Sequence, residues 1–377
     1  MKISGSCDDR FSAVREAFAN NFKNGLEVGA SVAITVDGKP VVDLWAGDAK
    51  KGGAPWQEDT IVNVYSTTKT MAATCVLLAA DRGLLDLDAP VADYWPEFGA
   101  NGKESVLVRH VMSHSAGVAG FDPPIEDANQ LYDWDSVVTG LAAQEPWWTP
   151  GDGSGYHAVT QGYLQGELVR RVTGRTLGTF FREEIAEPLG ADFHIGLRPE
   201  DDARVGALVP PGAPLGSDDA DPNSIAMRTM RSCRLDGTEP RTEGWRRAEI
   251  PAAGGIGNAR SVARVHSMLA CGGEVDGVRI LSEEMVGRIL EEQTRGTDRV
   301  LGVPLRFGMG FGLIDETFPL SPNQRAFFWG GWGGSLALID LDARVSIAYV
   351  MNRMEPNLMG DLRGGSLVMT TYASLAG

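Results

Sequence analysis

Strand-forming segments lie at both ends of this chain, and the middle is mainly helix-forming. Near the N-terminus, residues 30–47 (ASVAITVDGKPVVDLWAG) hold two β-branched runs around Asp37-Gly38, the dipeptide that a type I′ hairpin turn requires. Near the C-terminus, residues 326–340 (AFFWGGWGGSLALID) and 343–352 (ARVSIAYVMN) are two further runs around a turn at Leu341-Asp342. Both ends therefore have to find strand partners.

The simplest closed arrangement pairs the terminal strands in one antiparallel sheet, covered by helices at 11–24 and 358–375. This predicts an α+β fold with a sheet domain formed by residues 1–85 and 246–377 and a mainly helical domain formed by residues 86–245. Residues 200–225 are rich in Asp, Pro and Gly, which is typical of a long surface loop. We expect the active site in the cleft between the two domains, where ligand sites concentrate.

Charge and apolar patterning exclude several classes of partner. The 377 residues carry 34 basic and 50 acidic side chains, a net charge of −16 that argues against nucleic acid and against an anionic membrane surface. The first residues, MKISGSCDDRF, lack the apolar run of a signal peptide, and no segment reaches 18 uninterrupted apolar residues. We therefore expect a cytoplasmic protein with free cysteines and a small-molecule partner; assembly into a homo-oligomer stays open.

Common catalytic motifs are missing from the sequence. There is no Gly-x-Ser-x-Gly, no HExxH and no GxxxxGK[ST] motif, and the five histidines (110, 114, 157, 194, 266) show no metal-ligand spacing. We expect neither a metal nor a cofactor.

A serine and a lysine stand three residues apart at the start of an apolar helix. Ser66 and Lys69 open the predicted helix 66–82 (STTKTMAATCVLLAADR), and residues i and i+3 share one face of a helix. Lys69 is one of only seven lysines in the chain. Burial and the helix dipole lower the pKa of a lysine, and a neutral amine can take the serine proton. The alternative is that Ser66 caps the helix and Lys69 is a solvated first-turn residue.

A tyrosine in a glycine-flanked loop is the second candidate. Tyr156 follows Trp147-Trp148 and precedes a predicted helix at 160–173. A phenol near a lysine ammonium has a lowered pKa and can act as a base. Its neighbour His157 is expected to position the loop rather than to form a triad. Trp148 either lines the acyl pocket or packs beneath this loop.

Glycine-rich sequence on a predicted C-terminal strand is the third element. Trp329-Gly330-Gly331 and then Trp332 lie on this strand, where glycines allow the backbone to approach a ligand closely. Backbone N–H groups there could form an oxyanion hole together with that of Ser66. Our candidate substrate-binding residues are Trp329, Gly330, Gly331, Trp148 and His157.

With these three elements in order, the chain resembles the serine β-lactamase and penicillin-binding-protein superfamily, and within it the class C β-lactamase-like carboxylesterases of family VIII. The resemblance rests on NVYSTTKTMAA, PWWTPGDGSGYHAVTQGYLQGELVRRVTGRTLG and WGGWGGSLALID, and it covers nearly the whole chain. It implies a β-lactamase-like fold, with Ser66 as the acylated nucleophile, Lys69 as its activating partner and Tyr156 as the general acid and base. It also implies that the N–H groups of Ser66 and Trp332 form the oxyanion hole.

Two departures from the family pattern favour esters over antibiotics. Ala158 stands where true β-lactamases of this type have an Asn, and Trp329 replaces the Lys that meets the β-lactam carboxylate. The resemblance thus implies a serine carboxylesterase for short-chain esters. The alternatives are an acyltransferase or a weak cephalosporin hydrolase that uses the same residues, and, as a different class, a penicillin-recognising sensor that stays acylated.

Overall fold

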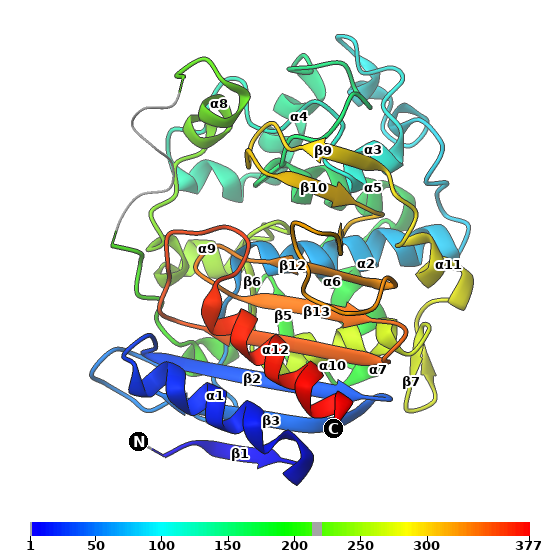
Figure 1. The fold of residues 1–377 in the computed structure, drawn as a ribbon. Helices are drawn as coiled ribbons and strands as arrows, with labels where there is room; N and C mark the ends of the chain where they lie inside the picture. Colours follow the sequence, from blue (N-terminus) through cyan, green and yellow to red (C-terminus); the bar gives the residue numbers. More distant parts are fainter. Residues whose placement is uncertain (1, 213–220) are drawn as a thin grey trace.

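The fold, seen in a computed structural model that describes residues 2–212 and 221–377, is built on a nine-stranded antiparallel sheet (Figure 1). Neighbouring strands from edge to edge are β1 (Ser4–Cys7), β3 (Lys39–Gly47), β2 (Gly29–Val36), β14 (Val345–Met351), β13 (Leu336–Asp340), β12 (Ala326–Gly330), β11 (Gly312–Leu313), β10 (Pro304–Phe307) and β9 (Thr294–Thr297).

The terminal strands pair as the sequence predicted. Asp37 and Gly38 both have positive φ (49° and 76°) and close a two-residue turn between β2 and β3, as a type I′ hairpin requires. β2 then pairs with β14, with Val32 opposite Tyr349, so the two ends of the chain share one sheet. The α+β fold is confirmed.

Helices cover both faces of the sheet. α1 (Ser12–Lys23) and α12 (Leu362–Ala376) lie together on one face, drawn in front of the sheet in Figure 1. Arg10, just before α1, links the two helices by donating hydrogen bonds to the carbonyls of Ser374 and Leu375 in α12, at 2.8 and 2.7 Å. α10 (Ala259–Ala270) packs against β2, β13 and β14 on the opposite face.

The predicted helix at 66–82 begins with a 3-10 turn, Tyr65–Thr67, and continues as α2 (Thr68–Asp81). Its side chains are buried from Thr68 to Ala79, so apolar composition on all sides correctly indicated a central helix. α2 packs against α5 (Thr160–Thr173) and α6 (Leu177–Phe181).

The middle of the chain is mainly helical but not wholly so. Its other helices are α3 (Val108–Met112), α4 (Trp134–Ala143), α7 (Glu187–Leu189), α8 (Ile225–Ser232) and α9 (Glu243–Arg247). It also contains β5 (Phe193–Ile195), which joins β6 (Gly255–Gly257) and β4 (Val62–Asn63) in a three-stranded sheet. This small sheet links segments from both predicted domains, whose boundaries stay a prediction.

Two local expectations need correction. The predicted surface loop at 200–225 contains 3-10 helix at Pro199–Arg204 and the start of α8, and residues 213–220 of it lie outside the described residues. The glycine-rich segment is not one strand, because only Trp329 and Gly330 belong to β12. Trp332, Gly333 and Gly334 lie in the turn before β13, where φ values of 101° and 127° at the two glycines break the strand.

The remaining elements lie at the periphery. They are the hairpin β7 (Glu274–Val275) and β8 (Val278–Arg279) and the helix α11 (Glu283–Arg288).

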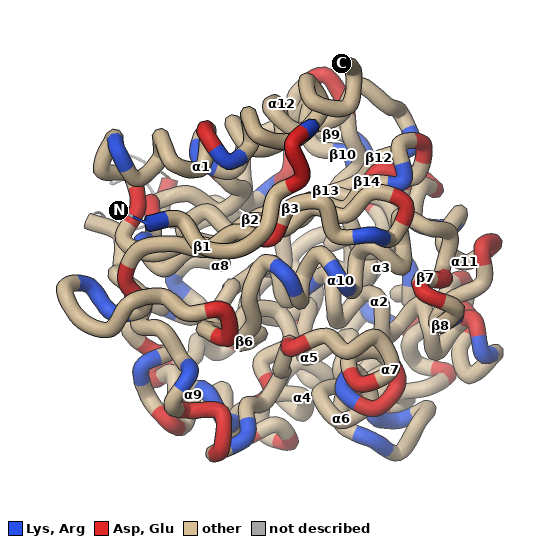
Figure 2. Tube along the Cα trace, turned by 90° about the horizontal axis from the view of Figure 1, so that it is seen from below, with Lys and Arg blue, Asp and Glu red and all other residues tan. Residues whose placement is uncertain are grey.

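Seen from below, basic and acidic residues alternate along outer helices and turns (Figure 2). In the described residues, no helix has both the length and the apolar character needed to cross a bilayer.

Candidate active site

Ser66 and Lys69 meet at the start of the buried helix. Lys69 Nζ lies 3.3 Å from Ser66 Oγ, as the i, i+3 spacing predicted. The lysine side chain is 2% exposed, which excludes the alternative of a solvated first-turn residue. The two side chains therefore form a pair shielded from bulk water.

The Lys69 amine is held between two loops. Nζ donates to the carbonyl oxygens of Ala158 at 2.6 Å and Ala252 at 3.0 Å. Burial lowers the pKa of Lys69 well below its usual value, because the ammonium loses its hydration and no carboxylate of the described residues pairs with it. A neutral amine at 3.3 Å from a serine hydroxyl can accept its proton.

Tyr156 lies against the same pair. Lys69 Nζ is 4.8 Å from the centre of the Tyr156 ring, and the Trp329 indole N–H donates to the phenol oxygen at 3.4 Å. Burial raises the pKa of the Tyr156 phenol, although contacts with Ser66 and Trp329 act in the opposite direction. The expectation of a lowered pKa is therefore wrong, because burial of the phenol dominates. Burial also disfavours the charged form of the neighbouring Lys69 amine.

Asp298, which sequence reasoning missed, anchors the Tyr156 loop. One oxygen of this fully buried carboxylate accepts the backbone N–H groups of Tyr156 (3.0 Å), Val300 (2.9 Å) and Leu301 (2.9 Å). Nothing in the local sequence TRGTDRV distinguishes this Asp from an ordinary turn residue. Only the tertiary fold brings it to the tyrosine.

Two buried histidines complete the support of this loop. His157 Nε2 accepts the Val118 N–H at 3.2 Å, so its Nδ1 carries the proton and donates to the Gly155 carbonyl at 2.6 Å. Its backbone N–H donates to Nδ1 of His114 at 3.1 Å. Burial lowers the pKa of His157 to about 3, which keeps the ring neutral. His157 thus has its ring nitrogens occupied in positioning the loop.

The turn after β12 passes close to the backbone of Ser66. A Cβ on Gly331 would lie 2.1 Å from the Val64 carbonyl oxygen and 3.2 Å from the Ser66 nitrogen, so glycine is required for this approach. The buried Arg363 side chain holds the turn by donating to the Gly333 carbonyl at 2.6 Å.

The Trp332 N–H is available in this turn. It donates to no acceptor among the described residues. Ser66 lies in the first turn of its helix, where N–H groups lack partners within the helix. An oxyanion hole formed by the N–H groups of Ser66 and Trp332 stays a prediction. It requires two backbone N–H groups that have no other acceptor.

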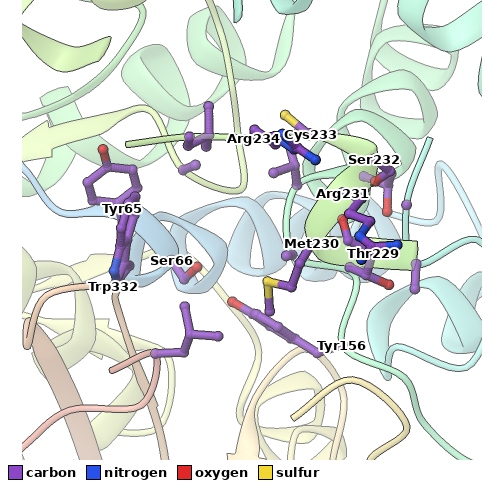
Figure 3. A pocket seen from close by; sticks show the side chains of 18 of the residues that line it. Tyr65, Ser66, Tyr156, Thr229, Met230, Arg231, Ser232, Cys233, Arg234 and Trp332 are labelled. Atoms are coloured by element: carbon purple, nitrogen blue, oxygen red, sulfur yellow. Dashed lines mark hydrogen bonds between the residues drawn. The ribbon is translucent and has the colours of Figure 1, made fainter. Parts of the chain in front are cut away.

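A cavity of about 700 Å³ opens above the serine. Figure 3 shows Tyr65 and Trp332 on one side of Ser66 and Tyr156 with Met230 on the other. Tyr65 and Trp332 pack edge to face, with ring centres 5.0 Å apart. Ser66 and Tyr156 both line this cavity, so these two side chains face one space.

The candidate substrate-binding residues are not among those that line this cavity. Contact of Trp329, Gly330, Gly331, Trp148 and His157 with substrate stays a prediction. Trp329 is buried against Tyr156, with ring centres 5.3 Å apart. Trp148 packs beneath the tyrosine loop, where a Cβ on Gly155 would lie 2.6 Å from its ring.

α8 and the segment after it form a wall that sequence reasoning did not identify. The lining residues from this part are Met227, Thr229, Met230, Arg231, Ser232, Cys233, Arg234, Leu235 and Asp236. The spacing of Met227 and Met230 on one helix face is the only signal in the sequence, and it is equally typical of a core helix.

The site consists of side-chain and backbone groups without a metal-ligand cluster. In the described ranges, no three His, Cys, Asp or Glu side chains gather as a metal ion would require. All four cysteines are free thiols.

Comparison with known proteins gives consistent matches over the whole chain. A family model described as Beta-lactamase matches residues 18–366. The curated Esterase/beta-lactamase LipL of Mycobacterium tuberculosis is 39% identical over 396 aligned positions, covering 100% of this chain and 87% of that protein. The crystal structure of a family VIII carboxylesterase superposes with a TM-score of 0.93 at 43% identity, covering 99% of this chain and 100% of that chain. A penicillin-binding protein homologue from Caulobacter crescentus has a TM-score of 0.92 at 41% identity, with the same coverage.

Proposed function

The chain belongs to the beta-lactamase family, and we propose that it is a serine carboxylesterase that hydrolyses short-chain esters through an acyl-enzyme on Ser66. The observation that carries the proposal is the Ser66 hydroxyl, 3.3 Å from a buried amine at the base of the cavity. The similarity to a family VIII carboxylesterase and to an esterase/beta-lactamase supports ester hydrolysis.

Acylation begins with proton transfer from Ser66 to Lys69. The Ser66 oxygen then forms a bond to the ester carbonyl carbon, and the carbonyl oxygen becomes an oxyanion that backbone N–H groups stabilise. As the carbon–oxygen bond to the alcohol breaks, Tyr156 donates its proton to the leaving oxygen. The lysine ammonium returns a proton to the phenolate, so the pair is neutral again.

Deacylation repeats these steps with water. Water gives a proton to the Tyr156–Lys69 pair and attacks the acyl carbon, and Ser66 regains its proton as the acid leaves. The raised pKa of the phenol fits this role, since a protonated Tyr156 is the form that protonates the alcohol. When the phenol loses its proton, Lys69 supplies a replacement, so the two groups titrate as a coupled pair.

Two positions favour esters over β-lactams. Ala158 contributes only its backbone carbonyl, which is already taken by Lys69, so it offers no amide to a lactam side chain. Trp329 is 2% exposed and supplies an indole to Tyr156 instead of a cation to a carboxylate. Recognition of an antibiotic through these two positions is therefore lost.

The test is turnover of p-nitrophenyl butyrate by purified variants. Ser66→Ala is expected to lower kcat/KM by about 10⁴-fold or more, the scale on which loss of a nucleophile acts. Lys69→Met and Tyr156→Phe should be nearly as severe. Ser374→Ala, on α12, is the matched control and should keep wild-type activity. Wild-type rates in Ser66→Ala would disprove the assignment.

The same preparation separates the rival functions. Nitrocefin hydrolysis measures β-lactamase activity, and an ester product exceeding the acid in the presence of an added alcohol would identify a transferase. Mass spectrometry after incubation with a penicillin tests the sensor hypothesis. A stable adduct on Ser66 without ester turnover would favour a sensor over an esterase.

A further inference from the structure

The mouth of the cavity carries two arginines that have no partner in the described part of the chain. Arg231 and Arg234 both line the cavity and are exposed to solvent. Neither makes an ion pair or a side-chain hydrogen bond with any described residue, whereas most other arginines lie within 4.0 Å of a carboxylate. Figure 3 shows both on the side of the cavity formed by α8.

The nearby carboxylates are already engaged. Asp236, which also lines the cavity, accepts the backbone N–H and the hydroxyl of Thr238 at 2.8 and 2.5 Å. Glu239 accepts the N–H groups of Asp236 and Gly237 at 2.6 and 3.0 Å, and the Tyr65 hydroxyl at 3.3 Å. These acids serve the turn that follows α8, and within residues 2–212 and 221–377 no carboxylate pairs with either guanidinium group.

The backbone that carries the arginines is well supported. The Ser232 carbonyl accepts the Ile125 N–H at 2.7 Å, and Cys233 and Ile125 form a parallel bridge. Gly120 packs so closely that a Cβ there would lie 2.4 Å from Ser232 Oγ. The segment between the arginines is thus fixed against residues 120–125, and only the long side chains have to adjust.

The geometry points to an anion-binding subsite formed by Arg231 and Arg234, which selects esters that carry a carboxylate, such as half-esters of dicarboxylic acids. This deepens the proposed function and rests on it. Guanidinium groups bind carboxylates through paired N–H donors. The whole chain has a net charge of −16, which repels anions, so local cations at the cavity mouth are what such a substrate needs. The rest of the wall, with Met227 and Met230, suits the chain between the ester and the carboxylate.

A matched pair of substrates tests the subsite. The p-nitrophenyl ester of pentanoic acid and the p-nitrophenyl half-ester of glutaric acid have acyl chains of equal length and differ by one carboxylate. A second pair, phenyl acetate and 3-carboxyphenyl acetate, places the charge on the alcohol. In each pair the readout is the ratio of kcat/KM for the anionic ester to kcat/KM for the neutral ester.

The double variant Arg231→Gln/Arg234→Gln is expected to lower this ratio by about 10-fold in at least one pair, as loss of two exposed ion pairs allows. The change should lie in KM, and the neutral ester should keep its rate. Added salt should lower the ratio in wild type and not in the variant. Arg231→Lys/Arg234→Lys, which keeps both charges, should retain most of the ratio.

Arg228→Gln is the control for a charge change on the same helix. Arg228 pairs with Asp122 at 3.3 Å and lies over the Trp147 ring at 4.1 Å, away from the cavity lining. This variant should leave the ratio unchanged. An unchanged ratio in the double variant for both pairs would overturn the subsite, as would equal loss of neutral and anionic turnover. Failure of the proposed esterase function gives a different result: the Ser66→Ala variant would still hydrolyse the neutral ester.

Discussion

A single amine connects the chemistry of this site with the stability of the fold. Lys69 is buried beside Ser66 and donates to carbonyls from two separate loops. Because burial lowers its pKa, the folded protein holds the amine neutral over a range of pH in which the unfolded chain binds a proton there. The proposed mechanism needs this neutral form, so ester turnover should fall as the pH drops through the lowered pKa of Lys69.

The same shift predicts a pH dependence of stability. Between the lowered pKa and the ordinary value near 10.5, the unfolded state binds more protons at Lys69, so the free energy of unfolding rises with pH. The slope from this group approaches about 1.4 kcal/mol per pH unit. Lys69→Met removes it. Urea unfolding of both proteins at about pH 8 and about pH 9.5 measures the difference, and equal pH dependences would contradict the expectation.

Sequence reasoning selected the residues to which we assign the reaction and missed the residues that support them. Ser66 and Lys69 are three residues apart in a helix, so local geometry brings them together. Tyr156 was recognisable from its glycine-flanked loop and from the resemblance. Asp298 reaches the site only through tertiary contacts, which no local pattern encodes. The pKa of Tyr156 was predicted in the wrong direction, because burial was underestimated.

At the scale of elements, α5 sets the position of a loop that holds the Lys69 amine. Gly162 of α5 packs so tightly that a Cβ there would lie 2.3 Å from the Ala252 nitrogen. The carbonyl of Ala252 is one of the two acceptors of Lys69. The helix can approach this loop only because residue 162 has no side chain.

Gly162→Ala is therefore expected to destabilise the protein by about 1–3 kcal/mol through overpacking, against the usual gain from replacing glycine in a helix. Displacement of Ala252 should also lower kcat on p-nitrophenyl butyrate. Gly140→Ala in α4 is the control, since a Cβ there meets nothing within 4 Å, and it should stabilise by up to about 1 kcal/mol. Thermal unfolding compares the two, and a stabilised, fully active Gly162→Ala would refute the argument.

The elements themselves were predictable where a strong local signal exists. The β2–β3 hairpin followed from Asp37-Gly38, and α2 from its apolar length. The three-residue strand β5 and the turn at Trp332 were not predicted. A strand this short has no periodicity to detect, and the glycines that make the turn equally suit a close approach within a strand.

At the scale of the whole molecule, the two ends of the chain and its middle depend on one another. β5, from the middle, pairs with β6, and α5 and α6 pack against α2. Residues 86–245 thus bury their apolar faces on segments outside themselves. We therefore expect that neither part of the predicted division at residues 85 and 246 folds independently.

We expect residues 86–245, expressed alone, to show no cooperative thermal transition and no near-UV circular dichroism. The exposed apolar faces of α5 and α6 would leave too little buried surface to offset chain entropy. The full chain, unfolded under the same conditions, is the control. A sharp transition in the fragment would show that the helical segment is an autonomous domain.

The distribution of lysine has a practical consequence for attaching the protein to a surface. Lys69 and Lys103 are buried, and the exposed lysines are residues 2, 23, 39, 50 and 51. All of them precede α2, in and around the strands β1 to β3, at the opposite end of the molecule from α8 in Figure 1. Amine-reactive chemistry would tether the molecule by this edge, so immobilised copies would share one orientation and present the cavity mouth to the solution.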